Sequence, residues 1–150
     1  SFEKLRLRAY DDFYPNKKVK LGEKVFGTLT IGWGHTGKWI ENNTTISEQK
    51  ADELLIQDIK NAEKIVRNLV KIPINDNQYS ALVSFAYNCG GGYISKSTAK
   101  WTPYELWRFV NEGKEIKQKW LSTAITSKGK PMQGLINRRL AEVNLYLKPI

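Results

Sequence analysis

Side chains near the start of the chain have the types and the order needed to cleave a glycosidic bond. Glu3 and Asp12 are carboxylates, and Thr30 opens the run TIGWGHT after a polar, basic stretch. Hydrolysis of a glycosidic bond requires one carboxylic acid that protonates the leaving oxygen and a second group that activates water or captures the sugar. A carboxyl group beside an apolar wall would stay protonated, while one in a wetter environment would stay ionised, so two carboxyl groups can play opposite roles. The pair is not specific by itself, since most of the 15 acidic residues are expected to be solvated surface charges.

A glycine-rich turn follows Thr30. Gly32 and Gly34 flank Trp33, and their missing side chains would let the backbone approach a sugar ring or turn tightly. His35 could be a general base or a metal ligand, but it is the only histidine, and a hydrogen-bonding role in the turn is favoured. We predict that Gly32, Trp33, Gly34 and His35 contact a bound saccharide.

Extended segments are expected to position these residues. Charged and apolar residues alternate from Leu5 to Asp11, which suits a strand better than the end of a helix. Residues 13–27 contain Pro15, Asn16 and glycines around short apolar pieces, which is typical of a hairpin with a long polar excursion. Residues 28–33 are β-branched and aromatic enough to form a second strand.

The remainder of the chain shows the three- and four-residue spacing of apolar side chains that is typical of helices. Thr45 and Glu48 form a predicted capping box for a helix that ends near Lys71, before Pro73. An asparagine and a glutamine repeat this start signal before a nearly all-apolar helix over 75–90, which we expect to be central and buried. Shorter helices are predicted over 103–111, 115–123 and 134–147.

This order of elements predicts one α+β domain. A β-containing lobe of about residues 1–45 precedes a helical lobe of about residues 46–150. A chain of 150 residues with 41% hydrophobic residues can bury one sizeable core. No apolar run reaches the ~18 residues of a membrane span, and no targeting segment is visible.

A net charge of +9 indicates that the chain attracts polyanions without saying which. Nucleic acid, anionic membranes and anionic cell-wall polymers all fit, but scattered basic residues without a nucleic-acid-binding signature disfavour nucleic acid. Cys89 is the only cysteine, which excludes an intramolecular disulfide and, with one histidine, makes a zinc site implausible. We interpret Cys89 as a buried, inert thiol and expect neither a metal nor a cofactor.

Three blocks of the sequence resemble the phage-type lysozymes, the endolysins of glycoside hydrolase family 24. The blocks are residues 3–12 with 30–36, residues 77–90, and residues 134–146. The resemblance implies a lysozyme-like fold, in which a long helix joins a small β-hairpin lobe to a larger helical lobe and the active-site cleft lies between them.

In this resemblance, Glu3 matches the general acid, Asp12 the second carboxylate, and Thr30 the hydroxyl that helps to hold the attacking water. The family favours inversion by direct attack of water, for which the carboxyl groups should stand roughly 6.5 to 9.5 Å apart. Retention through a covalent intermediate is the second choice. Two features depart from the family pattern: Lys4 stands where glycine is usual, and the segment between Asp12 and Thr30 is far longer than in compact members. That lysine-rich segment could be a solvated hairpin extension or could contact an anionic wall polymer.

Two further pairs of residues belong to the predicted site. Tyr87 and Asn88 end the central helix, where they could offer a ring face and amide hydrogen bonds to a saccharide or could simply pack. Arg138 and Arg139 could support the site by pairing with acidic groups, including Glu3. Because adjacent residues of a helix point in different directions, we expect only one of these arginines to face inward.

The implied substrate is bacterial peptidoglycan, cleaved between N-acetylmuramic acid and N-acetylglucosamine. Chitin oligomers are an alternative substrate, and lytic transglycosylation, which omits water, is an alternative mechanism. A non-catalytic wall-binding module, or a cationic protein that permeabilises membranes through the helix over 134–147, would be a different class of function. We expect a monomer that collects in the host cytoplasm before release to the periplasm or cell wall, with no nucleic acid partner and no stable membrane insertion.

Overall fold

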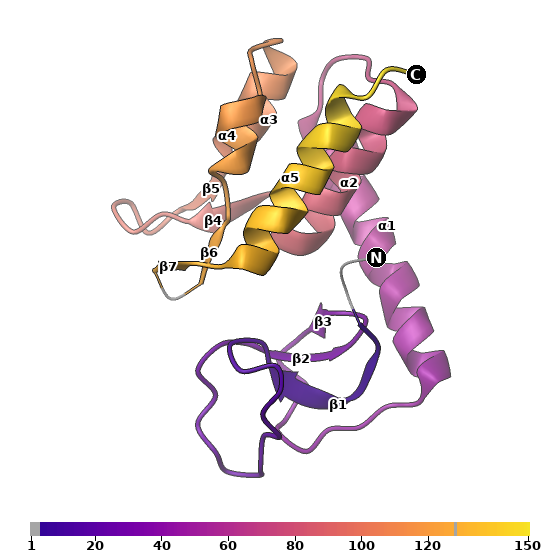
Figure 1. Ribbon diagram of the computed structural model, residues 1–150, viewed down its shortest axis with the longest axis vertical. Coiled ribbons are helices and arrows are strands. Elements are labelled where there is room, and N and C mark those ends of the chain that lie inside the picture. Colours follow the sequence, from indigo (N-terminus) through magenta and orange to yellow (C-terminus); the bar gives the residue numbers. More distant parts are fainter. Residues whose placement is uncertain (1–3, 128) are drawn as a thin grey trace. The chain divides into compact units, whose positions relative to one another are not determined.

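A long helix, α1 (Glu48–Leu69), contains the boundary between two compact units of the chain (Figure 1). The computed structural model describes residues 4–127 and 129–150. The units are Ser1–Asp58 and Ile59–Ile150. Strands and loops precede α1, whereas helices dominate the second unit, so the α+β class predicted from the sequence is confirmed.

An antiparallel three-stranded sheet lies at the centre of the first unit. β1 (Arg6–Asp11) pairs with β2 (Leu29–Gly32), which in turn pairs with β3 (His35–Thr36). The strands predicted over 5–11 and 28–33 are therefore confirmed. The third strand was not predicted, because two residues are too few to show a periodic pattern.

A small apolar core covers one face of this sheet. Successive residues of a strand point to opposite faces, and Ala9 and Ile31 are the inward residues, with exposed fractions of 3% and 0%. Ile40 joins them from the loop after β3, and Leu29 and Ile46 pack against the three. Such a core buries little apolar surface, so polar contacts must also hold the loops of this unit.

The start of α1 differs from the predicted capping box. Thr45 forms an isolated antiparallel bridge with Arg8 of β1 and therefore belongs to the sheet side of the connection. Ser47 caps the helix instead, since its hydroxyl accepts a hydrogen bond from Lys50 N at 3.1 Å. The prediction that Thr45 begins the helix was wrong, because pairing with a distant strand is not visible in the local sequence.

Further helices follow in the described part of the second unit. α2 (Asp76–Cys89) and α5 (Gln133–Leu147) pack against each other, and α3 (Glu105–Asn111) and α4 (Lys117–Leu121) complete the set (Figure 1). These elements confirm the predicted helices, with ends that differ by a few residues. No helix in the described ranges has the length and apolar character that a membrane span would need.

The predicted capping box and burial of α2 are confirmed. Asn75 Oδ1 accepts a hydrogen bond from Gln78 N at 2.8 Å, and Gln78 Oε1 accepts one from Asn75 N at 2.9 Å. Leu82 and Phe85, both fully buried, lie at the centre of the larger core. The ring of Phe85 meets three other rings edge-on at centroid distances of 5.4 to 6.0 Å, those of Tyr104, Trp107 and Trp120.

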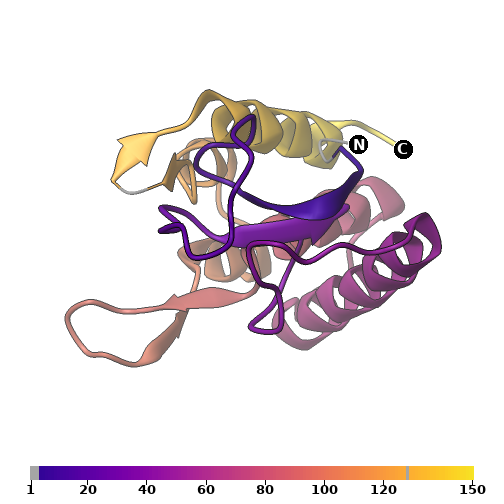
Figure 2. The ribbon, with the colours of Figure 1, turned by 90° about the horizontal axis from the view of Figure 1, so that it is seen from below.

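Two short hairpins in the second unit were not predicted. β4 (Gly92–Ile94) pairs with β5 (Trp101–Pro103), and β6 (Thr126–Ser127) pairs with β7 (Lys130–Pro131). Figure 2 shows the β4–β5 hairpin, in salmon, projecting from the helices of its unit. The glycine run at its start predicts the end of α2 but carries no strand pattern.

Candidate active site

The backbone of Thr28 holds both Asp12 and Thr30. Asp12, just after β1, accepts a hydrogen bond on Oδ1 from Thr28 N at 2.6 Å. Thr30, within β2, donates from Oγ1 to Thr28 O at 3.0 Å. Asp12 is exposed, whereas Thr30 is buried with an exposed fraction of 5%. The structure therefore brings these two predicted residues to the same end of the β1–β2 pair.

This arrangement suits the handling of a water molecule. A hydroxyl that donates its proton to a carbonyl oxygen keeps its lone pairs for accepting hydrogen bonds. An exposed carboxylate beside it can accept a proton from water as a general base. Glu3, the predicted general acid, lies outside the described residues.

Asp11 is the buried carboxylate of this region, and the sequence interpretation did not single it out. Its Oδ1 accepts hydrogen bonds from Phe13 N and Gly27 N, both at 2.9 Å, and its Oδ2 accepts one from Phe26 N at 2.7 Å. Asp11 thereby ties both ends of the segment between β1 and β2 to the end of β1. The available signal was an aspartate directly before a turn, since such side chains commonly accept from the backbone two residues later.

Substituting Asp11 with asparagine is expected to lower the free energy of unfolding by about 1.5 to 3 kcal/mol. The amide nitrogen that replaces one carboxylate oxygen cannot accept a hydrogen bond, so a backbone N–H loses its partner. Asp12→Asn is the matched control, because Asp12 is exposed and its loss should change stability less. Urea unfolding followed by circular dichroism measures both variants, and equal changes would contradict the role given to Asp11.

The turn between β2 and β3 is tight, which is one of the two roles considered for its glycines. Gly32 and Gly34 have φ angles of +67° and +89°, in the left-handed region where other residues are strained. Trp33, between them, donates from Nε1 to Asp52 Oδ1 of α1 at 2.9 Å. The ring of Trp33 is therefore held by the first turns of α1.

His35 has the structural hydrogen-bonding role that the sequence favoured. Its Nδ1 lies 2.8 Å from Asp58 Oδ2 of α1. Trp39 Nε1 donates to His35 Nε2 at 3.4 Å, and the two rings lie 5.9 Å apart. Because Nε2 accepts, we assign the ring proton to Nδ1, which donates to Asp58. Both ring nitrogens are thus engaged, Nδ1 with α1 and Nε2 with the loop after β3.

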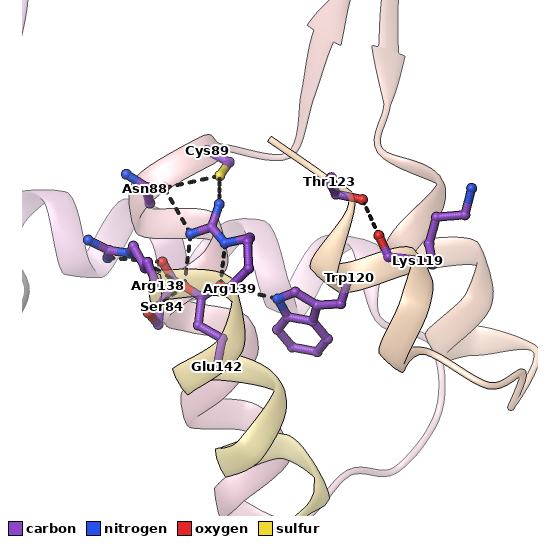
Figure 3. A network of polar contacts seen from close by, with 9 residues as sticks. All are labelled: Ser84, Asn88, Cys89, Lys119, Trp120, Thr123, Arg138, Arg139 and Glu142. Atoms are coloured by element: carbon purple, nitrogen blue, oxygen red, sulfur yellow. Dashed lines mark hydrogen bonds and ion pairs between the residues drawn. The ribbon is translucent and has the colours of Figure 1, made fainter. Parts of the chain in front are cut away.

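A buried polar network lies between α2 and α5 in the second unit (Figure 3). Glu142 accepts hydrogen bonds from Trp120 Nε1 at 3.1 Å and from Ser84 Oγ at 2.7 Å. The same carboxylate lies 2.8 Å from Arg139 Nε and 3.4 Å from Arg138 Nε. Glu142 and Arg139 have exposed fractions of 2% and 0%, so two guanidinium groups share one buried carboxylate.

Both predicted arginines face inward, so the expectation that only one would do so was wrong. Arg138 and Arg139 stand four and three residues before Glu142, and both spacings place side chains on the same side of a helix. Arg139 also donates to Asn88 Oδ1 at 2.8 Å, and Arg138 donates to Ser84 O at 3.3 Å. The spacing to Glu142 was present in the sequence and could have indicated this pairing.

Tyr87 and Asn88 both have partners inside the second unit. The guanidinium carbon of Arg138 lies 5.7 Å from the centroid of the Tyr87 ring, a cation–π contact. Asn88 Oδ1 accepts from Arg139 Nη2. These contacts agree with the packing role that the sequence left open, and contact with a saccharide stays a prediction for both residues.

Cys89 is a protonated thiol beside this network. Burial raises the pKa of Cys89 to about 11, against the opposing charge of Arg139, whose Nη1 donates to Cys89 Sγ at 2.6 Å. A thiol that keeps its proton at neutral pH is a poor nucleophile, as the sequence predicted. Among the residues that the structure describes, no group of three or more His, Cys, Asp or Glu side chains is placed to hold a metal ion.

The raised pKa of Cys89 predicts a loss of stability at alkaline pH. An unfolded thiol releases its proton near pH 9, whereas the folded thiol keeps it until about pH 11. Between these values the unfolded state binds fewer protons, so stability falls as pH rises, by about 2 to 3 kcal/mol in full. The serine of the Cys89→Ser variant does not titrate in this range, so the variant should lack this contribution to the decrease in the free energy of unfolding. Urea unfolding of both proteins across this range measures it, and a difference that does not change with pH would contradict the prediction.

Comparisons with known proteins agree with this fold. A solved structure, the muramidase domain of SpmX from Asticaccaulis excentricus, is 29% identical, with a TM-score of 0.68 over 99% of this chain and 90% of that one. An endolysin of Bacillus phage B103 is 37% identical over 98% of this chain and 50% of its own length. A SAR-endolysin of Bacteriophage PS119 is 33% identical over 87% of this chain and 74% of its own length. The chain spans about half the length of several curated relatives that it matches.

A family model described as phage lysozyme matches residues 1–142. The match includes Glu3, Asp12, Thr30 and the two buried arginines of α5. Together with the shared fold, it confirms the lysozyme-like architecture expected from the three sequence blocks. The chain therefore belongs to the phage lysozyme family.

Proposed function

We propose that the chain is a muramidase, a glycoside hydrolase that cleaves the β-1,4 bond between N-acetylmuramic acid and N-acetylglucosamine in bacterial peptidoglycan. The observation that carries this proposal is the placement of Asp12 and Thr30 on the backbone of Thr28, within the segment that the family model covers. Two relatives named as endolysins and a similar muramidase domain support it.

In the proposed reaction, Glu3 donates a proton to the leaving oxygen as the bond from that oxygen to the anomeric carbon breaks. A water molecule attacks the anomeric carbon from the opposite face of the sugar, and Asp12 accepts one of its protons. Thr30 holds the water by accepting a hydrogen bond from its other proton. The product is inverted, Glu3 ends ionised and Asp12 protonated, and exchange with solvent restores both carboxyl groups. The reaction needs no metal and no cofactor.

Contacts with the saccharide are proposed for the turn over residues 32–35 and for Tyr87 and Asn88. Hydrogen bonds from the side chains of Trp33 and His35 to α1 hold these side chains before any sugar binds, which lowers the cost of ordering them on binding. Arg138 and Arg139 act as supporting residues, because both are buried and Arg139 orients the Asn88 amide.

The proposed enzyme works on the cell wall as a monomer, with residues 1–150 acting as one lysozyme-like domain. Its charge of +9 suits a wall that carries carboxylates and phosphates. As an endolysin, it would collect in the host cytoplasm before release to the periplasm or cell wall. Nucleic acid and stable membrane insertion have no part in this function.

Mass spectrometry of fragments released from purified peptidoglycan tests the proposal. We expect reducing N-acetylmuramic acid ends, because water adds to the anomeric carbon of that sugar, and NMR of the first product should show the inverted anomer. Anhydro ends would identify a lytic transglycosylase instead. Cleavage of chitin oligomers but not of peptidoglycan would identify chitin as the substrate instead. A folded protein that binds walls without releasing fragments would be a wall-binding module, and hydrolysis would be rejected.

A further inference from the structure

The segment between β1 and β2 is folded back on β1. Arg6 Nη1 donates to Pro15 O at 2.9 Å, and Arg8 Nη2 donates to Val19 O at 2.8 Å. The side chain of Val19 is buried, with an exposed fraction of 3%. Asn42 Nδ2 donates to two more carbonyl oxygens of the segment, at 2.8 and 2.9 Å. The segment is therefore anchored to the sheet, although most of its residues are exposed.

A pocket of about 350 Å³ lies between β1 and this segment, and we call it the β1 pocket. Residues 5–10 line it from the strand side and residues 15–18 from the segment. Its lining includes four basic residues, Arg6, Arg8, Lys17 and Lys18. No aspartate or glutamate is among the lining residues in the described part of the chain. The volume falls in the lower range of sites that bind small ligands.

The positive charge of the β1 pocket is only partly balanced by its neighbours. Lys17 Nζ lies 3.1 Å from Glu23 Oε2, in an exposed ion pair. Arg6 and Arg8 donate hydrogen bonds to backbone carbonyl oxygens, which are neutral and do not cancel the guanidinium charges. Lys18 is exposed and has no ion pair within residues 4–127 and 129–150. The site therefore favours a ligand that carries more than one negative charge.

We propose that the β1 pocket binds a phosphodiester polymer of the bacterial wall, in which short polyol units link successive phosphates. Arginine forks pair with phosphate oxygens through two parallel hydrogen bonds, and lysines add point charges. A chain of phosphates can meet basic side chains on both walls of the pocket, whereas a single carboxylate of a peptide would meet one. The proposal rests on the proposed wall substrate, and the bound polymer holds the enzyme beside the glycan that it cleaves.

The variant Lys17→Gln/Lys18→Gln removes charge from the pocket and keeps the arginines that anchor the segment. Its matched control is Lys96→Gln/Lys100→Gln, which removes the same charge from exposed lysines of the β4–β5 hairpin. Binding is measured by co-sedimentation with Gram-positive walls, before and after cold hydrofluoric acid removes the phosphodiester polymer. On intact walls we expect about tenfold weaker binding for the pocket variant and near-parent binding for the control. Lys17→Arg/Lys18→Arg should restore binding, and thermal unfolding checks that each variant is folded.

Several results would overturn the inference. Equal losses of binding in the two glutamine variants would show that net charge alone explains the effect. Equal binding of the parent protein to intact and stripped walls would show that the polymer is not the ligand. If inorganic phosphate competed as strongly as a soluble polyol phosphate at equal phosphate concentration, the pocket would be a site for a single phosphate ion and not for a polymer. Equally strong competition by single-stranded DNA would point to nucleic acid.

Hydrolysis of the stripped peptidoglycan separates this inference from the proposed function. Without the polymer, the parent protein and the pocket variant should release reducing ends at the same rate. A parent protein that binds the polymer but releases no ends would overturn the proposed function and leave polymer binding standing. Release of reducing ends by a protein that does not prefer intact walls would support the proposed function and overturn polymer binding.

Discussion

Glu3→Gln is expected to release reducing ends from purified peptidoglycan about 10²- to 10⁴-fold more slowly than the parent protein. The carboxylic acid proposed at position 3 supplies a proton as the glycosidic bond breaks, and an amide of the same size cannot supply one. Such a change corresponds to about 3 to 5 kcal/mol on the activation barrier. A reducing-end assay at saturating peptidoglycan measures it.

Glu41→Gln provides the matched control for this experiment. Glu41 is an exposed glutamate of the same unit, and its backbone N–H, not its side chain, is bonded to Thr44. We expect this variant to keep the parent rate and both variants to bind walls as the parent does. A Glu3→Gln protein as active as Glu41→Gln would show that another group donates the proton.

Glu142→Gln is expected to lower the free energy of unfolding by about 3 to 5 kcal/mol. Glutamine keeps the size of the side chain but leaves Arg138 and Arg139 buried without the carboxylate that they share. In the parent protein, the two carboxylate oxygens accept hydrogen bonds from Trp120 and Ser84. In the variant, an amide nitrogen, which is a donor, takes the place of one of these oxygens. Urea unfolding followed by tryptophan fluorescence measures the loss, and Trp120 reports on the network directly.

Glu105→Gln is the control that separates burial from charge. Glu105 lies 2.7 Å from Lys119 Nζ and 3.6 Å from Arg108 Nη2, so it also faces two cations, but its side chain is exposed. Water and salt screen such surface pairs, and we expect little measurable change in stability. If both substitutions destabilised the protein equally, the special role of the buried network would be lost.

Most of the fold followed from local features of the sequence. The capping box of Asn75 and Gln78 and the apolar run behind it predicted α2, because caps and helical periodicity act over a few residues. Alternation predicted β1, and β-branched and aromatic residues predicted β2, for the same reason. The order of three motif blocks pointed to the phage lysozyme family, whose model covers most of the chain.

Elements that depend on distant partners were missed or misplaced. The start of α1 lies after the predicted position because Thr45 pairs with Arg8 of β1, far away in the sequence. The two hairpins of the second unit consist of strands of two or three residues. Hydrogen bonds across the hairpin stabilise these strands, and they are too short to show a periodic pattern in the sequence.

The roles of the charged residues divide in the same way. Residue types and order placed Asp12 and Thr30 in a candidate site from the sequence alone. Asp11 and Asp12 are neighbours of one type, and only the tertiary structure decided that Asp11 is buried under three backbone donors while Asp12 stays exposed. It likewise decided that Arg138 and Arg139 are both buried around Glu142. A charge is buried only where donors or countercharges reach it, and for Asp11 these come mostly from backbone at the far end of a long segment.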